Sequence, residues 1–272
     1  MKICDFHVHS AFSDDSDASL TSIIEKALSL GIQKICITDH YDIDFPINEE
    51  NTLAFDLDTP AYIAAVTALK EEYKDRIDIR LGVEMGLMSH IKDKVHDYIS
   101  SHPSYDFVIG SSHLVDGKDP YFPSFYEGRS EKLSIRAYFE AILENVKVIT
   151  DYDVYGHLDY IVRYCPSGEA AFSSDDHEEI LREILQTIIS NGKGIEINTG
   201  SLYKGMSYAH PHMEILRLYK NLGGEIITVG SDAHKPEYLC YDFETFARDT
   251  LQSLGYKYFC TYKDRKPEFN LL

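Results

Sequence analysis

The sequence of 272 residues contains no apolar run long enough to span a bilayer. Residues 1–9 lead into a predicted strand and lack the pattern of a secretory signal. The five cysteines are odd in number and widely spaced, and they show none of the paired short spacings of a zinc finger, which argues against disulfides. We therefore expect a cytoplasmic protein without membrane attachment, whose cysteines are small buried side chains in a reducing compartment.

Lysine and arginine are few relative to the acidic residues, 26 against 45, so that the formal net charge is −19. The sequence contains no cluster of basic residues. Nucleic-acid binding draws most of its free energy from clustered basic side chains that neutralise phosphates. We therefore expect no nucleic acid among the partners, and the oligomeric state is left open.

Three catalytic motifs are also missing. The sequence has no Gly-x-Ser-x-Gly, and no Cys-x5-Arg occurs at any cysteine, which argues against a serine or cysteine nucleophile. A Walker A sequence is absent, which argues against nucleoside-triphosphate chemistry.

Short apolar runs alternate with helical patterns along the chain. Helices are predicted over 19–30, 59–73, 175–191, 212–222 and 243–254, with Thr59 as N-cap before Pro60 and a glycine after each of the other four. A closing strand is expected at 256–260. Seven strands alternating with helices predict a single α/β domain over residues 1–272, built as a parallel barrel. The predicted strands lie near residues 2–6, 34–38, 77–84, 106–112, 153–156, 194–198 and 225–230.

Each predicted strand ends near a side chain that can bind a metal. In a parallel barrel the carboxyl ends of the strands meet at one mouth, so these side chains become neighbours in space. His7 and His9, two residues apart on an extended segment, face the same side and can hold one ion. The pattern predicts a multinuclear metal centre. The side chains are His7, His9, Asp39, His40, Glu84, His113, His157, Glu196, Asp232 and His234.

The motifs that carry these side chains closely resemble the polymerase-and-histidinol-phosphatase (PHP) family. They include His7-Val8-His9-Ser10, Ile37-Thr38-Asp39-His40 and Gly230-Ser231-Asp232-Ala233-His234, and the likeness runs from residue 5 to about 240. The resemblance implies a distorted (β/α)7 TIM-like barrel with three divalent ions of zinc, manganese or iron at its C-terminal mouth.

The resemblance also implies the ligands of each ion. The first would be held by His7, His9, Glu84 and Asp232, and the second by Glu84, His113 and His157. The third would take His40, His234 and a residue from the loop after His9, where some relatives carry a histidine and this chain has aspartates. We favour Asp15 over Asp14 by its distance from His9, and a carboxylate there favours manganese or iron over zinc.

The activity implied is hydrolysis of a phosphate monoester by a hydroxide that bridges two ions, with Glu84, Asp232 and His234 as catalytic residues. The expected substrate is L-histidinol phosphate, cleaved to L-histidinol and phosphate in histidine biosynthesis. Alternatives are a nucleoside monophosphate, a sugar phosphate or phosphotyrosine as substrate, or a noncatalytic metal-binding accessory domain. A nuclease is a third alternative, disfavoured by the acidic charge.

Several further residues are candidates for substrate binding. Arg163 could pair bidentately with phosphate or form a surface salt bridge. Lys204 and Asn198 are two more candidates. Relatives commonly carry an arginine close to position 203, where this chain has Tyr203. The segment 114–123, rich in turn formers and aromatics, is either a lid over the mouth or a structural loop.

The other histidines carry weaker expectations. His90, His96 and His177 fall within helical patterns and are expected at the surface, and His102 is expected in a turn. His210 and His212 open a helix near the mouth, where they could support the site.

Overall fold

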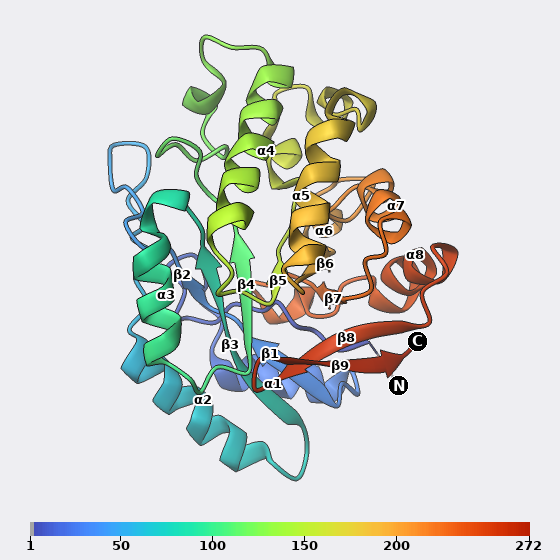
Figure 1. Ribbon diagram of the computed structural model, residues 1–272. Coiled ribbons are helices and arrows are strands. Elements are labelled where there is room, and N and C mark those ends of the chain that lie inside the picture. Colours follow the sequence, from blue (N-terminus) through green and yellow to red (C-terminus); the bar gives the residue numbers. More distant parts are fainter. Residues whose placement is uncertain (1–2) are drawn as a thin grey trace.

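The computed structural model describes residues 3–272, and its centre is a curled parallel sheet surrounded by helices (Figure 1). Six strands follow one another around the sheet in chain order, and a short strand β2, His40–Tyr41, pairs with β3 as a continuation beyond β1. The six are β1 Lys34–Ile37, β3 Asp78–Gly86, β4 Phe107–Ser111, β5 Val154–Tyr155, β6 Gly194–Asn198 and β7 Ile227–Gly230.

The segment 5–9 closes the sheet into a barrel. On one side it accepts hydrogen bonds from the amides of β1 and its extension, Cys36 to Asp5 at 2.9 Å and Thr38 to Val8 at 2.8 Å. On the other side it pairs with β7 and the residues that follow, through Phe6 N to Val229 O at 3.1 Å and His9 N to Ala233 O at 3.0 Å. The expected distorted barrel is therefore confirmed, although its first strand is only a pair of isolated bridges, at Asp5 and Val8. Residue 2 of that predicted strand lies outside the described residues.

The main helices lie outside the strands, and α2 to α5 cover the face formed by β3 to β5 (Figure 1). Where a helix was predicted to end before glycine, the glycine has a positive φ, such as 71° at Gly31 and 70° at Gly192, which other residues adopt at a cost. The helices are α1 Leu20–Ser29, α2 Thr59–Tyr73, α3 Lys92–Ser101, α4 Glu131–Val148, α5 Glu178–Ser190, α6 Gly200–Tyr203, α7 Met213–Asn221 and α8 Arg248–Ser253.

Two helix predictions need correction. The N-cap of α2 is Asp58 and not Thr59, because the Asp58 carboxylate accepts the amide hydrogen of Ala61 at 3.1 Å and Thr59 is already helical. The helix predicted from residue 243 begins as a π-helix, Phe243–Ala247, and continues as α8. Single-turn 3₁₀ helices lie between the main elements: η1 Ser89–Ile91, η2 Pro123–Tyr126, η3 Tyr160–Tyr164, η4 Gly168–Ala171, η5 Asp175–His177 and η6 Pro236–Tyr238.

The chain ends in a hairpin that packs against the amino-terminal ends of the barrel strands. A strand lies close to the one predicted at 256–260, but its predicted closing role is wrong, because β8 Tyr258–Lys263 pairs antiparallel with β9 Lys266–Leu271 in a separate two-stranded sheet. Arg265, in the hairpin turn, contacts the buried carboxylate of Asp153 with 2.5 Å between Nε and Oδ2. The hairpin thus covers the end of the barrel opposite to the mouth.

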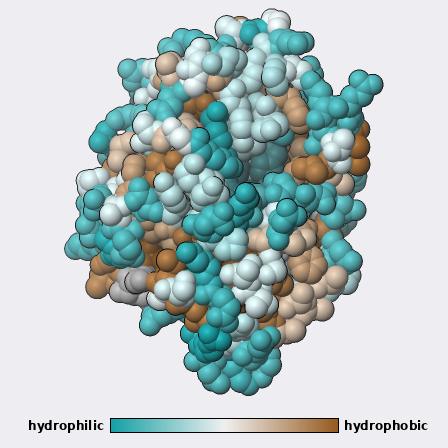
Figure 2. Space-filling view, turned by 180° about the vertical axis from the view of Figure 1, so that it is seen from behind, coloured by the Kyte–Doolittle hydropathy of each residue, from teal (hydrophilic) through white to brown (hydrophobic). Residues whose placement is uncertain are grey.

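No helix within residues 3–272 is long and apolar enough to cross a membrane. Hydrophilic side chains dominate the face shown in Figure 2, with hydrophobic side chains scattered between them. The buried apolar side chains form one core cluster that includes residues of β3 and β6 such as Val83, Ile195 and Ile197. Glu84 interrupts that apolar run within β3 and is fully buried, which an isolated carboxylate would not tolerate.

Candidate metal centre

Eight of the predicted metal ligands come together at the mouth of the barrel. The segment 5–9 contributes two of them, β2 and β3 one each, and the residues after β4, β5 and β7 the others. All are buried except His234, which is partly buried. The eight are His7, His9, His40, Glu84, His113, His157, Asp232 and His234.

Glu84 is the centre of this group. Its two carboxylate oxygens diverge, so that Oε1 faces one set of imidazoles and Oε2 another. Oε1 also accepts a hydrogen bond from Ser111 Oγ at 2.6 Å. The ring nitrogens around Glu84 are His157 Nε2 at 2.8 Å and His113 Nε2 at 3.3 Å from Oε1, and His40 Nδ1 at 3.0 Å, His7 Nε2 at 3.1 Å and His9 Nε2 at 3.4 Å from Oε2.

The electrostatics of the group keep its carboxylates ionised. Burial alone would protonate Glu84, but His7, His40 and His113 hold its pKa well below the ordinary value. Burial opposes protonation of His7, yet the neighbouring carboxylates, led by Glu196, raise its pKa well above the ordinary value. Burial and the adjacent His9 lower the pKa of His40, which stays a neutral imidazole. Ionised carboxylates and neutral imidazoles are the forms that bind metal ions, so His7 would release its proton when an ion binds.

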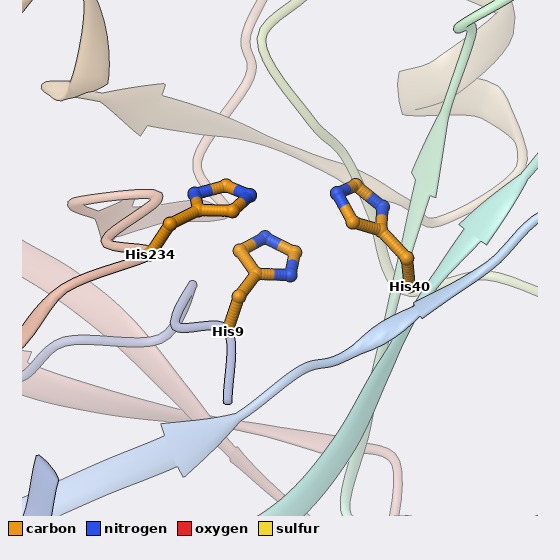
Figure 3. A group of neighbouring side chains, drawn as sticks. All are labelled: His9, His40 and His234. Atoms are coloured by element: carbon orange, nitrogen blue, oxygen red, sulfur yellow. The ribbon is translucent and has the colours of Figure 1, made fainter. Parts of the chain in front are cut away.

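The unpaired atoms of this group fit metal ions. His7 Nε2, His9 Nε2, His40 Nδ1 and Glu84 Oε2 are buried and have no hydrogen-bond partner. Buried polar atoms are rarely left without partners unless an ion or water satisfies them. Figure 3 shows the rings of His9, His40 and His234 gathered from three separate segments of the chain. Four sets of three residues offer ligand atoms within 4.8 Å of one another: His9, His40 and His234; His7, His9 and Asp232; His7, Glu84 and His157; and His40, Asp42 and His113.

The structure separates the two aspartates of the loop after His9. Asp15 Oδ2 lies 3.0 Å from His234 Nε2 and 3.8 Å from His40 Nε2. Asp14 faces the other way, and its Oδ2 accepts the amide hydrogens of Ala54 and Phe55, both at 2.9 Å. Asp15 is therefore the loop carboxylate that faces the histidines.

Two carboxylates support the histidines from behind. Glu196 Oε1 lies 2.7 Å from His7 Nδ1, on the opposite side of the ring from Glu84. Asp42, which the sequence analysis did not single out, places its two oxygens 2.9 and 3.0 Å from His113 Nδ1. A carboxylate on the second ring nitrogen fixes the orientation and tautomer of a metal-binding histidine.

Two glycines make room for these supporting carboxylates, and Gly86 is a signal that could have revealed Asp42. A Cβ atom on Gly86 would lie 1.7 Å from Asp42 Oδ1, and one on Gly230 would lie 2.2 Å from Glu196 Oε1. Both glycines lie beside predicted ligands in the sequence, at the ends of β3 and β7. Each of these two glycines, two residues from a metal ligand, thus marks where a second carboxylate approaches the backbone.

Further buried polar groups hold the loops that carry the ligands. Asp39, one of the predicted strand-end groups, faces the loop after His9 and accepts hydrogen bonds from Ser10 N at 2.6 Å and Ser13 Oγ at 2.7 Å. Asp159 bonds to His210, with 2.6 Å between Oδ1 and Nδ1, and accepts the amide hydrogen of His212 at 2.9 Å. His210 thus supports the segment after β5, as one reading of the sequence suggested.

A cavity of about 310 Å³ opens above the histidines. Arg163 lines it with a side chain that is only 5% exposed, and its Nε and one terminal nitrogen lack hydrogen-bond partners. Arg163 is therefore not part of a surface salt bridge. Lys204 lines the same cavity, together with Asp15, Asp42, Asp119, Asp232, Lys235, His40, His113, His157, His234 and the aromatic residues Phe45, Phe55, Tyr160, Tyr164, Tyr203 and Tyr238.

Two expectations about individual residues do not match their positions. Asn198 is fully buried and does not line the cavity; its Oδ1 accepts the amide hydrogen of Gly200 at 2.9 Å and its Nδ2 donates to Glu196 at 3.2 Å, so contact with a substrate is not supported. His177 is buried, 2% exposed, rather than at the surface, because its ring packs between Phe139 and Phe172.

Residues 5–200 match the family model described as the PHP domain, so the chain belongs to the PHP domain family. It is 33% identical to a histidinol-phosphatase of Lactococcus lactis subsp. lactis, over 99% of this chain and 98% of that protein. It is also 31% identical to a probable histidinol-phosphatase of Clostridium acetobutylicum, over 89% of this chain and 90% of that protein.

Two solved structures are similar over most of the chain. The crystal structure of histidinol phosphate phosphatase from Lactococcus lactis, complexed with zinc, L-histidinol and phosphate, has a TM-score of 0.86 at 31% identity. The similarity covers 98% of this chain and 99% of that chain. A putative histidinol phosphatase from Listeria monocytogenes has a TM-score of 0.76 at 18% identity, over 89% and 98% of the two chains, and shares the fold.

Proposed function

We propose that the protein is a metal-dependent phosphatase that hydrolyses L-histidinol phosphate to L-histidinol and phosphate. The observation that carries this proposal is the convergence of five histidines on the buried carboxylate of Glu84, beneath a cavity lined by Arg163, two of whose nitrogens have no hydrogen-bond partner. Similarity to the Lactococcus lactis enzyme over nearly the whole of both chains supports the choice of substrate. Histidine biosynthesis is the corresponding pathway, which would place the protein in the cytoplasm.

The ligand set fits three divalent ions of zinc, manganese or iron. We assign His7, His9, Glu84 and Asp232 to the first, Glu84, His113 and His157 to the second, and His40, His234 and Asp15 to the third. The carboxylate of Asp15 favours manganese or iron at the third position, because oxygen is a harder ligand than imidazole nitrogen. When bound, such ions lower the pKa of water and neutralise charge on a phosphoryl group.

The residues around the cavity supply charge for binding. Arg163 can donate two parallel hydrogen bonds to phosphoryl oxygens, and Lys204 adds a second positive charge on the same wall. Asp232 Oδ1 faces His9 Nε2 at 3.3 Å, whereas Oδ2 faces Arg163 at 3.9 Å. Burial opposes its ionisation, yet His7 and His9 hold the pKa of Asp232 well below the ordinary value, so this carboxylate stays ionised, the form that binds a metal ion.

The test is a comparison of kcat/KM over a panel of phosphate monoesters with the metal-loaded protein. The panel contains L-histidinol phosphate, a nucleoside monophosphate, a sugar phosphate, phosphotyrosine and p-nitrophenyl phosphate. We expect L-histidinol phosphate to have the highest kcat/KM, and Glu84→Gln to lower it by several orders of magnitude. A higher value for another ester would reassign the substrate, and bound metal without turnover of any ester would indicate a noncatalytic domain.

A further inference from the structure

Asp119 lies on the cavity wall at the end of a tight turn. The turn is closed by two backbone hydrogen bonds between Val115 and Lys118, at 2.9 and 3.0 Å. Asp119 Oδ1 accepts the amide hydrogen of Tyr121 at 2.8 Å, which leaves Oδ2 free of that contact. The turn and this hydrogen bond hold the carboxylate against the cavity rather than in the open solvent.

The cavity wall carries four carboxylates and three basic side chains. The carboxylates of Asp15 and Asp232 belong to the proposed metal ligands, and the cations Arg163, Lys204 and Lys235 follow β5, β6 and β7. The other two carboxylates, Asp42 and Asp119, follow β2 and β4. A phosphate monoester with its phosphoryl group near Arg163 has the carboxylates of Asp42 and Asp119 on the wall of the same cavity for its other end. Such a cavity suits a molecule with an anionic end and a cationic end.

Of these two carboxylates, only Asp119 is uncommitted. Asp42 is held by His113 through both oxygens, at 2.9 and 3.0 Å. Within residues 3–272, no lysine, arginine or histidine lies within ion-pair distance of Asp119. Burial raises the pKa of Asp119 to about 6, as expected for a carboxylate that lacks a cationic partner.

We propose that Asp119 binds the ammonium group of the amino-alcohol part of the substrate and thereby selects phosphate esters that carry an amine. This inference rests on the proposed function, because L-histidinol phosphate carries a primary amine three bonds from the ester oxygen. The ammonium supplies the cation that Asp119 lacks in the protein, and a hydrogen bond between two charged groups is stronger than one between neutral groups. Asp119 is then a specificity residue, while the chemistry at the phosphoryl group proceeds without it.

The test compares two ligands that differ by one amino group. L-Histidinol and its deamino analogue, 3-(imidazol-4-yl)propan-1-ol, are titrated by calorimetry into the metal-loaded protein in the presence of inorganic phosphate. We expect Asp119→Asn to weaken L-histidinol binding about 10- to 100-fold and to change binding of the analogue less than about threefold. The control Asp116→Asn removes one negative charge from the same loop at an exposed residue that does not line this cavity.

A second readout uses turnover. In Asp119→Asn, the expected change is a higher KM for L-histidinol phosphate with kcat nearly kept, and an unaltered kcat/KM for p-nitrophenyl phosphate. An equal loss of affinity for both ligands, or no loss of affinity for either, would overturn the role of Asp119. Because the calorimetric comparison needs no turnover, it is independent of the panel that tests the proposed function. A wild-type protein that prefers another ester would overturn that function, whereas the amine comparison still reports on Asp119.

Discussion

The carboxylate of Asp15 lies 3.0 Å from Nε2 of His234, while the adjacent Asp14 is bonded to backbone amides of the loop at 54–55. The two residues lie in a turn, and their side chains make contacts on different sides, so only one of the two faces the histidines. We predict that Asp15→Ala loses about one metal ion per chain and most of its activity. Metal content by mass spectrometry of the purified variants gives the answer, with Asp14→Ala as the matched control. Loss of metal in Asp14→Ala alone would transfer the role to Asp14.

Asp42 is predicted to act through His113. The variant Asp42→Asn keeps the shape of the side chain but removes the charge that fixes the ring, so metal affinity should fall about 10- to 100-fold. Competition with a chromophoric chelator measures this affinity directly. Asp44→Asn, which changes an exposed carboxylate two residues away, is the control. An unchanged affinity in Asp42→Asn would show that His113 does not need this carboxylate.

Arg163 is predicted to bind the phosphoryl group. Arg163→Ala removes charge-assisted hydrogen bonds, so kcat/KM for L-histidinol phosphate should fall about 100-fold with metal content unchanged. Arg163→Lys should restore only part of the loss, because an ammonium group lacks the planar donor pair of a guanidinium. If Arg163→Ala keeps the wild-type kcat/KM, the phosphate relies on other groups, and Lys204 is the next residue to replace.

The C-terminal hairpin is predicted to stabilise the barrel through Arg265. Arg265→Ala would leave the buried carboxylate of Asp153 without its cation and should lower the free energy of unfolding by about 1–3 kcal/mol, a range reduced because Arg265 is partly exposed. Urea unfolding measures this change. Arg182→Ala, which breaks an exposed pair with Glu178 on α5, should change stability by less than about 0.5 kcal/mol. Similar losses in both variants would contradict a special role for the hairpin.

Most of the fold could be predicted because it follows from local patterns. Apolar runs, glycine helix ends and metal-capable strand ends are all properties of short segments, and they led to seven strands and to the ligands now found together. The hairpin of β8 and β9 was not predicted, although polar and apolar residues alternate over 266–271. The apolar side chains of Phe269 and Leu271 are exposed, so they do not mark a core-facing strand, and the pairing of this segment with β8 is evident only in three dimensions.

The site was less predictable where side chains act through other side chains. Asp42 lies two residues beyond His40, yet its contact with His113 joins residues 71 positions apart. Asn198 resembles a substrate-binding group in the sequence, but the turn at Gly200 uses its side chain internally. Burial and pairing of this kind depend on how distant segments meet, which spacing along the chain does not record.

The most direct measurement follows metal content and turnover in the same samples. Protein stripped by a chelator is titrated with Zn²⁺ or Mn²⁺, and bound metal per chain and kcat/KM for L-histidinol phosphate are determined at each step. We predict no turnover without metal, and a rise to full activity as about three ions bind per chain. Stripped protein that hydrolyses L-histidinol phosphate as fast as the loaded protein, or loaded protein that binds its ions without hydrolysing it, would contradict the account.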